Sequence, residues 1–190
     1  SCGADLKGLL KSAVDDPNPV VVLEHKGLYW SKVPGTDAAK TIEPAEDYRL
    51  PFGMARTVQP LGDDIGTDST LAIITYGRGV HWALEASKAW PGRVEIFDLR
   101  SLSPVDEAAI LDSAARCHRC LVLTEEPPLG SFAQALAGLI SDRAFEHLDA
   151  PVRTLGSMEV PAIPLNETLE AAVLPNAEKV VAACQELLDY

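Results

Sequence analysis

The residues of this sequence that could carry chemistry begin with a glycine-rich turn, Tyr76-Gly77-Arg78-Gly79, and with His81 just after it. Backbone N–H groups in such a turn, together with the dipole of a following helix, can bind an anion such as a phosphate. Only half of a dinucleotide-binding motif is present, because the third glycine of G-x-G-x-x-G is missing. Two interpretations stay open: an anion or partner site that includes His81, and a plain strand-to-helix turn.

Two adjacent carboxylates, Glu125 and Glu126, form the second candidate. Neighbouring carboxylates can shift each other's pKa values and act as an acid and base pair. Side chains alternate between the two faces of a strand, however, so adjacent carboxylates at a strand end seldom converge. The alternative is that they interact with the dipole of the helix expected after Gly130, or that they lie at an interface.

The third candidate is a C-x-x-C pair, Cys117 and Cys120, which could be redox-active or half of a zinc site. A second pair is missing, and redox pairs normally open a helix, whereas this one falls between the end of a helix and the start of a strand. A structural role in the core is therefore favoured. With only four scattered cysteines, a disulfide scaffold is excluded and the cytoplasm is the expected location.

Alternating apolar segments predict the framework that holds these residues. Buried strands are expected at 71–76, 94–99, 120–124 and 152–155, and helical patterns separate them. This order predicts an α/β fold, a three-layer α/β/α domain whose mostly parallel sheet has about five strands. Residues 53–59 are expected to add one antiparallel edge strand. Ligands of such folds bind at the carboxyl edge of the sheet, where the glycine turn and the glutamates fall.

The amino-terminal part of the sequence follows another pattern. Residues 5–14 predict a helix, and residues 20–23 predict a short buried strand. The apolar face of the predicted helix comprises Leu6, Leu9, Leu10 and Ala13. The polar stretch 26–47 lacks periodicity and is expected to connect two domains. Within the main domain, Ser103 is expected to cap one helix and Asn176 the last one.

The composition limits the class of protein further. The chain has 190 residues, of which 47% are hydrophobic and 23% are charged, as in an ordinary globular domain. Its 16 basic and 28 acidic residues give a net charge of −12, which argues against nucleic-acid binding. No apolar run reaches the roughly 18 residues that a membrane helix needs. The chain begins with Ser1 and has no signal peptide, so we expect a piece of a longer protein.

Several ordered motifs add to this pattern, and the most specific is DLRSLSPVD at 98–106. The others, in chain order, lie at 5–13, 18–26, 48–55, 75–77, 80–86, 145–152, 161–164 and 174–176. Together they resemble the β subunit of thiamine-diphosphate-dependent 2-oxoacid dehydrogenase first components, which act on pyruvate or branched-chain 2-oxo acids. The resemblance covers nearly the whole chain. Transketolase and deoxyxylulose-phosphate synthase share the C-terminal fold but match these motifs less well.

The resemblance implies three parts: residues 1–30 as the tail of a pyrimidine-binding domain, 31–50 as a linker, and 51–190 as a transketolase C-terminal-like domain. It also implies thiamine diphosphate and Mg²⁺ in the whole enzyme. The family's G-D-G motif with a later Asn is absent here, and Gly62-Asp63-Asp64 does not replace it. We therefore expect this chain alone to bind neither group, and no catalytic residue is assigned in it.

The resemblance further implies that the whole enzyme decarboxylates a 2-oxo acid and passes the acyl group to lipoyl, with this chain as an assembly domain that is inactive alone. Expected partners are an α subunit or a fused α part, a second copy of the chain, and the dihydrolipoyl acyltransferase core; nucleic acid and membrane are not expected. Tyr190 is a candidate docking residue, and the acidic surface suits a basic partner. The alternatives are a free-standing anion-binding regulatory domain and the C-terminal domain of a transketolase or deoxyxylulose-phosphate synthase.

Overall fold

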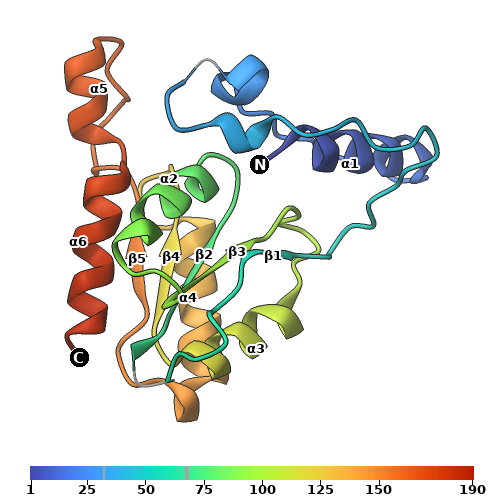
Figure 1. Ribbon diagram of the computed structural model, residues 1–190. Helices are drawn as coiled ribbons and strands as arrows, with labels where there is room; N and C mark the ends of the chain where they lie inside the picture. The colour runs from blue at the N-terminus through green and yellow to red at the C-terminus, as the bar shows by residue number, and fades with distance from the viewer. Residues whose placement is uncertain (32, 67–68) are drawn as a thin grey trace.

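The computed structural model describes residues 1–31, 33–66 and 69–190, which contain a five-stranded sheet between two helical layers (Figure 1). The strand order is β1-β3-β2-β4-β5; β1 pairs antiparallel with β3 at one edge, and the other neighbours are parallel. The strands are β1 Arg56–Gln59, β2 Leu71–Thr75, β3 Val94–Asp98, β4 Cys120–Leu123 and β5 Arg153–Leu155. The predicted α/β fold with one antiparallel edge strand is confirmed.

Helices α2 and α6 cover one face of the sheet, and α3 and α4 cover the other (Figure 1). The α-helices are α1 Gly3–Asp15, α2 Gly79–Ala86, α3 Glu107–Cys117, α4 Phe132–Arg143, α5 Glu167–Val173 and α6 Ala177–Leu188. The 3-10 helices are η1 Lys26–Ser31, η2 Asp37–Ala39, η4 Ser87–Ala89 and η5 Phe145–His147. Asn176 caps α6, as predicted. None of the helices in the described ranges is long and apolar enough to cross a lipid bilayer.

The side chains of the central strands alternate between two cores. In β2, Ala72 and Ile74 pack with α3 and α4, whereas Leu71 and Ile73 pack with α2 and α6. β2, β3 and β4 are buried along their whole length. Parallel strands covered on both faces must bury every side chain, which explains why they are continuous apolar runs rather than alternating ones.

Residues 20–23 differ from the prediction. They form neither a helix nor a strand, and Val21 and Leu23 are 83% and 79% exposed. β-branched residues favour a strand only where a neighbouring strand and a packed layer receive them. No strand among the described residues pairs with this segment, so the local preference is not satisfied.

The helix after β3 begins later than predicted. α3 starts at Glu107, and its cap is Asp106 rather than Ser103. The Asp106 carboxylate accepts a hydrogen bond from the N–H of Ala109 at 3.3 Å and another from the N–H of Ala55 at 2.9 Å. Asp106 is the better cap because one side chain satisfies both the helix end and the chain that enters β1.

Helix α1 lies clear of both helical layers, on the β1 side of the sheet (Figure 1). The helix was predicted, but its buried residues are Asp5 and Gly8, whereas Leu10 on the apolar face is 38% exposed. The Gly8 carbonyl accepts a hydrogen bond from the N–H of Leu50 at 3.3 Å, so α1 packs against the chain that returns toward β1. Of the predicted apolar face, Leu10 is exposed, whereas Leu6, Leu9 and Ala13 are half-buried, so this face is only partly covered.

Candidate functional site at the carboxyl edge of the sheet

Polar side chains that end the parallel strands meet at one edge of the sheet. Thr75 ends β2, Asp98 ends β3 and Thr124 follows β4, and all three are at most 1% exposed. Every residue that the sequence analysis assigned to a crevice follows β2 or β4 at this same edge: Gly77, Gly79, His81, Glu125, Glu126 and Gly130. The chain's own amino-terminal segment, defined here as residues 1–31, reaches this edge at several points.

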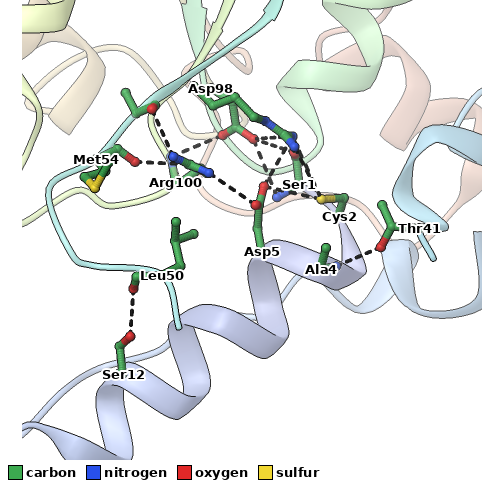
Figure 2. Close-up of polar contacts among 12 residues, drawn as sticks. Ser1, Cys2, Ala4, Asp5, Ser12, Thr41, Leu50, Met54, Asp98 and Arg100 are labelled. Atoms are coloured by element: carbon green, nitrogen blue, oxygen red, sulfur yellow. Dashed lines mark hydrogen bonds and ion pairs between the residues drawn. The ribbon is translucent and has the colours of Figure 1, made fainter. Parts of the chain in front are cut away.

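The first contact of the amino-terminal segment is a network of four charges, shown in Figure 2. The Ser1 hydroxyl donates to Asp98 Oδ2 at 2.5 Å. Arg56 Nη2 lies 3.2 Å from Asp5 Oδ2 and 3.6 Å from Asp98 Oδ2, so one guanidinium bridges two carboxylates. Arg100 Nη1 lies 3.3 Å from Asp5 Oδ1. Because Asp5 and Asp98 are buried, the two arginines are the charges that make their burial tolerable.

The second contact is made by His81, which is 3% exposed in the first turn of α2. Its Nε2 lies 3.0 Å from the carbonyl oxygen of Ser1. A carbonyl can only accept, so Nε2 carries the proton and Nδ1 of the neutral ring is an acceptor. Burial lowers the pKa of His81 below its usual value, and the hydrogen bond to Ser1 and the charge of Asp98 oppose this shift only in part. Neutral His81 therefore holds the start of the chain.

Acidification should weaken the fold through His81. Because the pKa of His81 is lower in the folded protein than in the unfolded chain, the unfolded chain takes up a proton at this ring first as the pH falls below about 6.5. Proton uptake by the unfolded chain lowers the free energy of unfolding, so the contribution of His81 is complete above that pH and is lost below it. We expect His81→Gln to reduce the fall in free energy of unfolding between about pH 7.5 and 5.5, measured by urea denaturation. The matched control is His147→Gln, because His147 is exposed. The same pH dependence in both variants would contradict the assignment to His81.

The third contact joins His25 of the amino-terminal segment to Glu125, with Nε2 3.1 Å from Oε2. Glu126 points elsewhere: its Oε1 accepts a hydrogen bond from the Tyr76 hydroxyl at 3.1 Å and lies 3.5 Å from the N–H of Ala133 in the first turn of α4. Burial raises the pKa of Tyr76 to about 12, so this hydroxyl stays a donor. The two glutamates do not converge, and the geometry favours the interface and helix-dipole interpretation over an acid and base pair.

The glycine turn has few free donors for an anion. The N–H groups of Gly79 and His81 already donate to the carbonyls of Tyr76 and Arg78, at 3.1 and 3.0 Å. Position 79 is a glycine for another reason, because a Cβ there would lie 2.0 Å from Thr75 Oγ1. Close packing of α2 on β2, rather than approach of a ligand, explains this residue.

A small cavity lies between α2 and residues 34–36. Its volume is about 110 Å³, which is below the range of roughly 300–1,000 Å³ that is usual for small-molecule sites. The guanidinium of Arg78 lies over the ring of Trp82, 5.0 Å from its centroid, and the carboxylate of Glu85 shares the lining. The cavity is therefore too small for a nucleotide.

The C-x-x-C pair has the structural role that was favoured. Cys117 ends α3 and Cys120 begins β4, and both are fully buried. Burial raises the pKa of Cys120 to about 12 and also raises that of Cys117, with the nearby Glu95 charge adding to both shifts. Thiols in this state are poor nucleophiles and poor metal ligands. Within the described ranges, no group of three or more His, Cys, Asp or Glu side chains could hold a metal ion.

The buried thiols should react slowly with an alkylating reagent. Burial raises the pKa of Cys184 to about 12 as well. We expect iodoacetamide at about pH 8 to label Cys117, Cys120 and Cys184 at least roughly 100-fold more slowly in the folded protein than in denaturant, because the thiolate is the reactive form. Peptide mass spectrometry measures each rate. Labelling of Cys117 at equal rates in both states would contradict its burial.

The stretch that comes nearest to the family's cofactor motif, Gly62-Asp63-Asp64, lies away from the candidate site. The N–H of Gly62 donates to the carbonyl of Gly92 at 2.8 Å, just before β3 begins. Asp63 and Asp64 therefore lie by the amino ends of the strands, away from the carboxyl edge. This position disfavours the Gly62-Asp63-Asp64 stretch as a substitute for the missing family motif.

The network of Asp5, Arg56, Asp98 and Arg100 was not foreseen as a site. One signal was available, because Asp98 and Arg100 stand in the most specific motif and Asp98 closes an apolar strand. Asp5 carried no such signal, since nothing local indicates that a residue of the first helix reaches a strand end. Tyr190, by contrast, follows α6 and is 64% exposed; its docking role stays a prediction.

The strand order and the helices on both faces of the sheet define a Rossmann-like α/β domain. Residues 64–180 match the family model described as the transketolase C-terminal domain. The chain therefore belongs to the transketolase C-terminal domain family. Its resemblance to β subunits of 2-oxoacid dehydrogenases is confirmed along nearly its whole length, as the following relatives show.

The chain is 38% identical over 189 residues to 2-oxoisovalerate dehydrogenase subunit beta of Bacillus subtilis, covering 98% of this chain and 54% of that protein. It is 36% identical over 189 residues to the mitochondrial pyruvate dehydrogenase E1 component subunit beta of Caenorhabditis elegans, which covers 97% of this chain and 50% of that protein. A solved structure of a split-gene transketolase, an inactive β4 tetramer, superposes with a TM-score of 0.60 at 23% identity and shows the same fold. The superposition covers 76% of this chain and 45% of the transketolase chain. The chain thus spans about half the length of the curated relatives it matches.

Proposed function

We propose that this chain supplies the C-terminal assembly domain of the first component of a 2-oxoacid dehydrogenase, of the pyruvate or branched-chain type. The whole enzyme would decarboxylate a 2-oxo acid on thiamine diphosphate and pass the acyl group to lipoyl. The observation that carries this proposal is the covered carboxyl edge. Asp98, His81 and Glu125 contact the chain's own amino-terminal segment there instead of facing an open pocket.

We also propose the division into residues 1–30, 31–50 and 51–190. The exposed apolar side chains of the amino-terminal segment support it, because Leu10, Val14, Val21 and Leu23 are 38%, 84%, 83% and 79% exposed. Such a concentration of apolar surface favours burial against another protein part. The remainder of a pyrimidine-binding domain would provide that part and would give residues 20–23 the strand neighbours they lack.

The proposed partners are an α subunit or a fused α part, a second copy of the chain, and the dihydrolipoyl acyltransferase core. The names of the relatives support the first of these, since they are subunits called beta. The net charge of −12 supports a basic docking partner near Tyr190. The four free, buried cysteines suit the proposed cytoplasmic location.

Titration calorimetry with thiamine diphosphate and Mg²⁺ tests the proposal. The 190-residue chain should show no binding, and the same chain produced with its upstream half and its α partner should bind the cofactor and decarboxylate pyruvate or 2-oxoisovalerate. The matched control is Asp63→Asn/Asp64→Asn in the assembly, which should bind the cofactor as tightly as the wild type. Tight one-to-one binding by the chain alone would refute the proposal.

No observation favours the free-standing anion-binding domain, because the N–H groups of Gly79 and His81 are occupied and the neighbouring cavity is small. A phosphate titration followed by amide NMR separates the two functions. Shifts at Gly79 and His81 would support the anion site, and their absence would leave the assembly domain as the better proposal.

A further inference from the structure

The side chain of Arg100 joins three separate parts of the chain. Its Nε donates to the carbonyl of Met54 at 3.0 Å, its Nη2 donates to the carbonyl of Ala55 at 3.0 Å, and its Nη1 lies 3.3 Å from Asp5 Oδ1 (Figure 2). The side chain is 9% exposed. The planar guanidinium presents donors in fixed directions, so three acceptors held around it fix the relative positions of α1, the entry to β1 and the end of β3.

The backbone of Arg100 supports a specific role for this residue. Its φ is +56°, in the left-handed region, which is unfavourable for a residue with a Cβ. Asp98 Oδ1 accepts the N–H of Arg100 at 3.2 Å and helps to hold this conformation. A residue keeps an unfavourable backbone conformation only where neighbouring contacts stabilise it. In this conformation the guanidinium of Arg100 points toward Asp5.

Asp5 is the residue of α1 that meets both arginines at the sheet edge. Further along the helix, the Ser12 hydroxyl donates to the carbonyl of Leu50 at 2.8 Å, which belongs to the returning chain rather than to the sheet. The first turn of α1 is therefore the point where the orientation of the helix on the domain is set. A change at Asp5 is therefore expected to alter the orientation of α1 on the domain.

We infer that Arg100 is a positioning residue: through Asp5 it sets the orientation of α1, and of the protein part that α1 carries, on the carboxyl edge of the sheet. The inference rests on the proposed function, in which that part contributes the thiamine diphosphate site. Buried ion pairs seldom add net stability but can select one arrangement among several. Arg100 acts on the cofactor site without touching the cofactor.

Hydrogen exchange with mass spectrometry on the assembled protein tests the first half of this inference. Arg100→Gln and Asp5→Asn should each speed amide exchange in residues 3–15 at least tenfold and leave β2 and β4 unchanged. Asp5→Asn is the gentler variant, because the bonds from Arg100 to Met54 and Ala55 survive it. Arg143→Gln, at a surface ion pair with Glu107, is the matched control and should change neither region.

Calorimetry on the same assembly tests the second half. Arg100→Gln should raise the Kd for thiamine diphosphate at least tenfold, and Arg100→Lys should restore only part of the affinity, because an ammonium cannot serve all three acceptors. Unchanged exchange in residues 3–15, faster exchange everywhere, or faster exchange with an unchanged Kd would each overturn the inference. If the wild-type assembly binds no thiamine diphosphate, the proposed function fails, and the exchange rates alone decide whether Arg100 holds α1.

Discussion

Gly79→Ala should lower the free energy of unfolding by about 3 kcal/mol. A Cβ at this position would lie 2.0 Å from Thr75 Oγ1 and 3.3 Å from Thr75 Cβ. The fully buried Thr75 hydroxyl donates to the carbonyl of Leu123 at 2.8 Å. Turning Thr75 away would leave a buried donor unpaired, and moving α2 would loosen its packing on β2. Both responses are costly, and urea denaturation measures their sum.

Gly138→Ala is the matched control for this prediction. Gly138 lies within α4, and a Cβ there meets no atom within 4 Å. Alanine should therefore be neutral or stabilise the protein by up to about 1 kcal/mol. Adding Gly79→Ala to Thr75→Ala should cost much less stability than Gly79→Ala costs in the wild type, since the contact with Oγ1 is gone and only the 3.3 Å contact with Cβ remains. Equal stability of Gly79→Ala and Gly138→Ala would show that Thr75 does not determine the glycine.

The sheet could be predicted because its central strands carry their own signal. Residues 71–74 are an apolar run that is buried on both faces, and the helices between strands repeat at helical spacing. Because helices connect successive strands, these strands are expected to run parallel, and few topologies remain possible. The position of the glycine turn and the glutamates at the carboxyl edge followed from that order alone, before any contact was known.

The amino-terminal segment could not be predicted in the same way. Residues 20–23 are as apolar as residues 71–74 and contain more β-branched residues, yet among the described residues only the segment 71–74 has strand neighbours. Composition reports what a segment can do, and its neighbours decide whether it does so. Helix α1 shows the same limit, because its periodicity predicted the helix correctly but not that its buried residues would be Asp5 and Gly8 rather than its leucines.

The contacts that cover the carboxyl edge could not be predicted from the sequence either. His81 lies 80 residues from Ser1, and His25 lies 100 residues from Glu125. Periodicity and capping signals extend over a few turns only, so no local pattern pairs these residues. The resemblance to β subunits contributed in a different way, because it predicted that the catalytic residues lie outside this chain, and this stays a prediction.

Arg116→Met should lower the free energy of unfolding by about 2–3 kcal/mol, more than an ordinary surface pair would. Glu95 in β3 is 4% exposed, and its Oε1 lies 3.0 Å from Arg116 Nη2. Methionine keeps much of the aliphatic volume but leaves a buried carboxylate without a counter-charge. The arginine side chain itself is 49% exposed, so water compensates part of the loss, which places the expected cost below that of a fully buried pair.

The double variant Glu95→Gln/Arg116→Met separates the loss of an attraction from the burial of an unpaired charge. If the unpaired carboxylate causes the loss, the double variant should be more stable than Arg116→Met, because a neutral amide can still bond with the Ser113 hydroxyl that now contacts Glu95. Arg143→Met removes a partner from the surface pair with Glu107 and should cost less than about 1 kcal/mol. If Arg116→Met costs no more than that control, Ser113 alone satisfies the carboxylate, and the buried charge needs no cation.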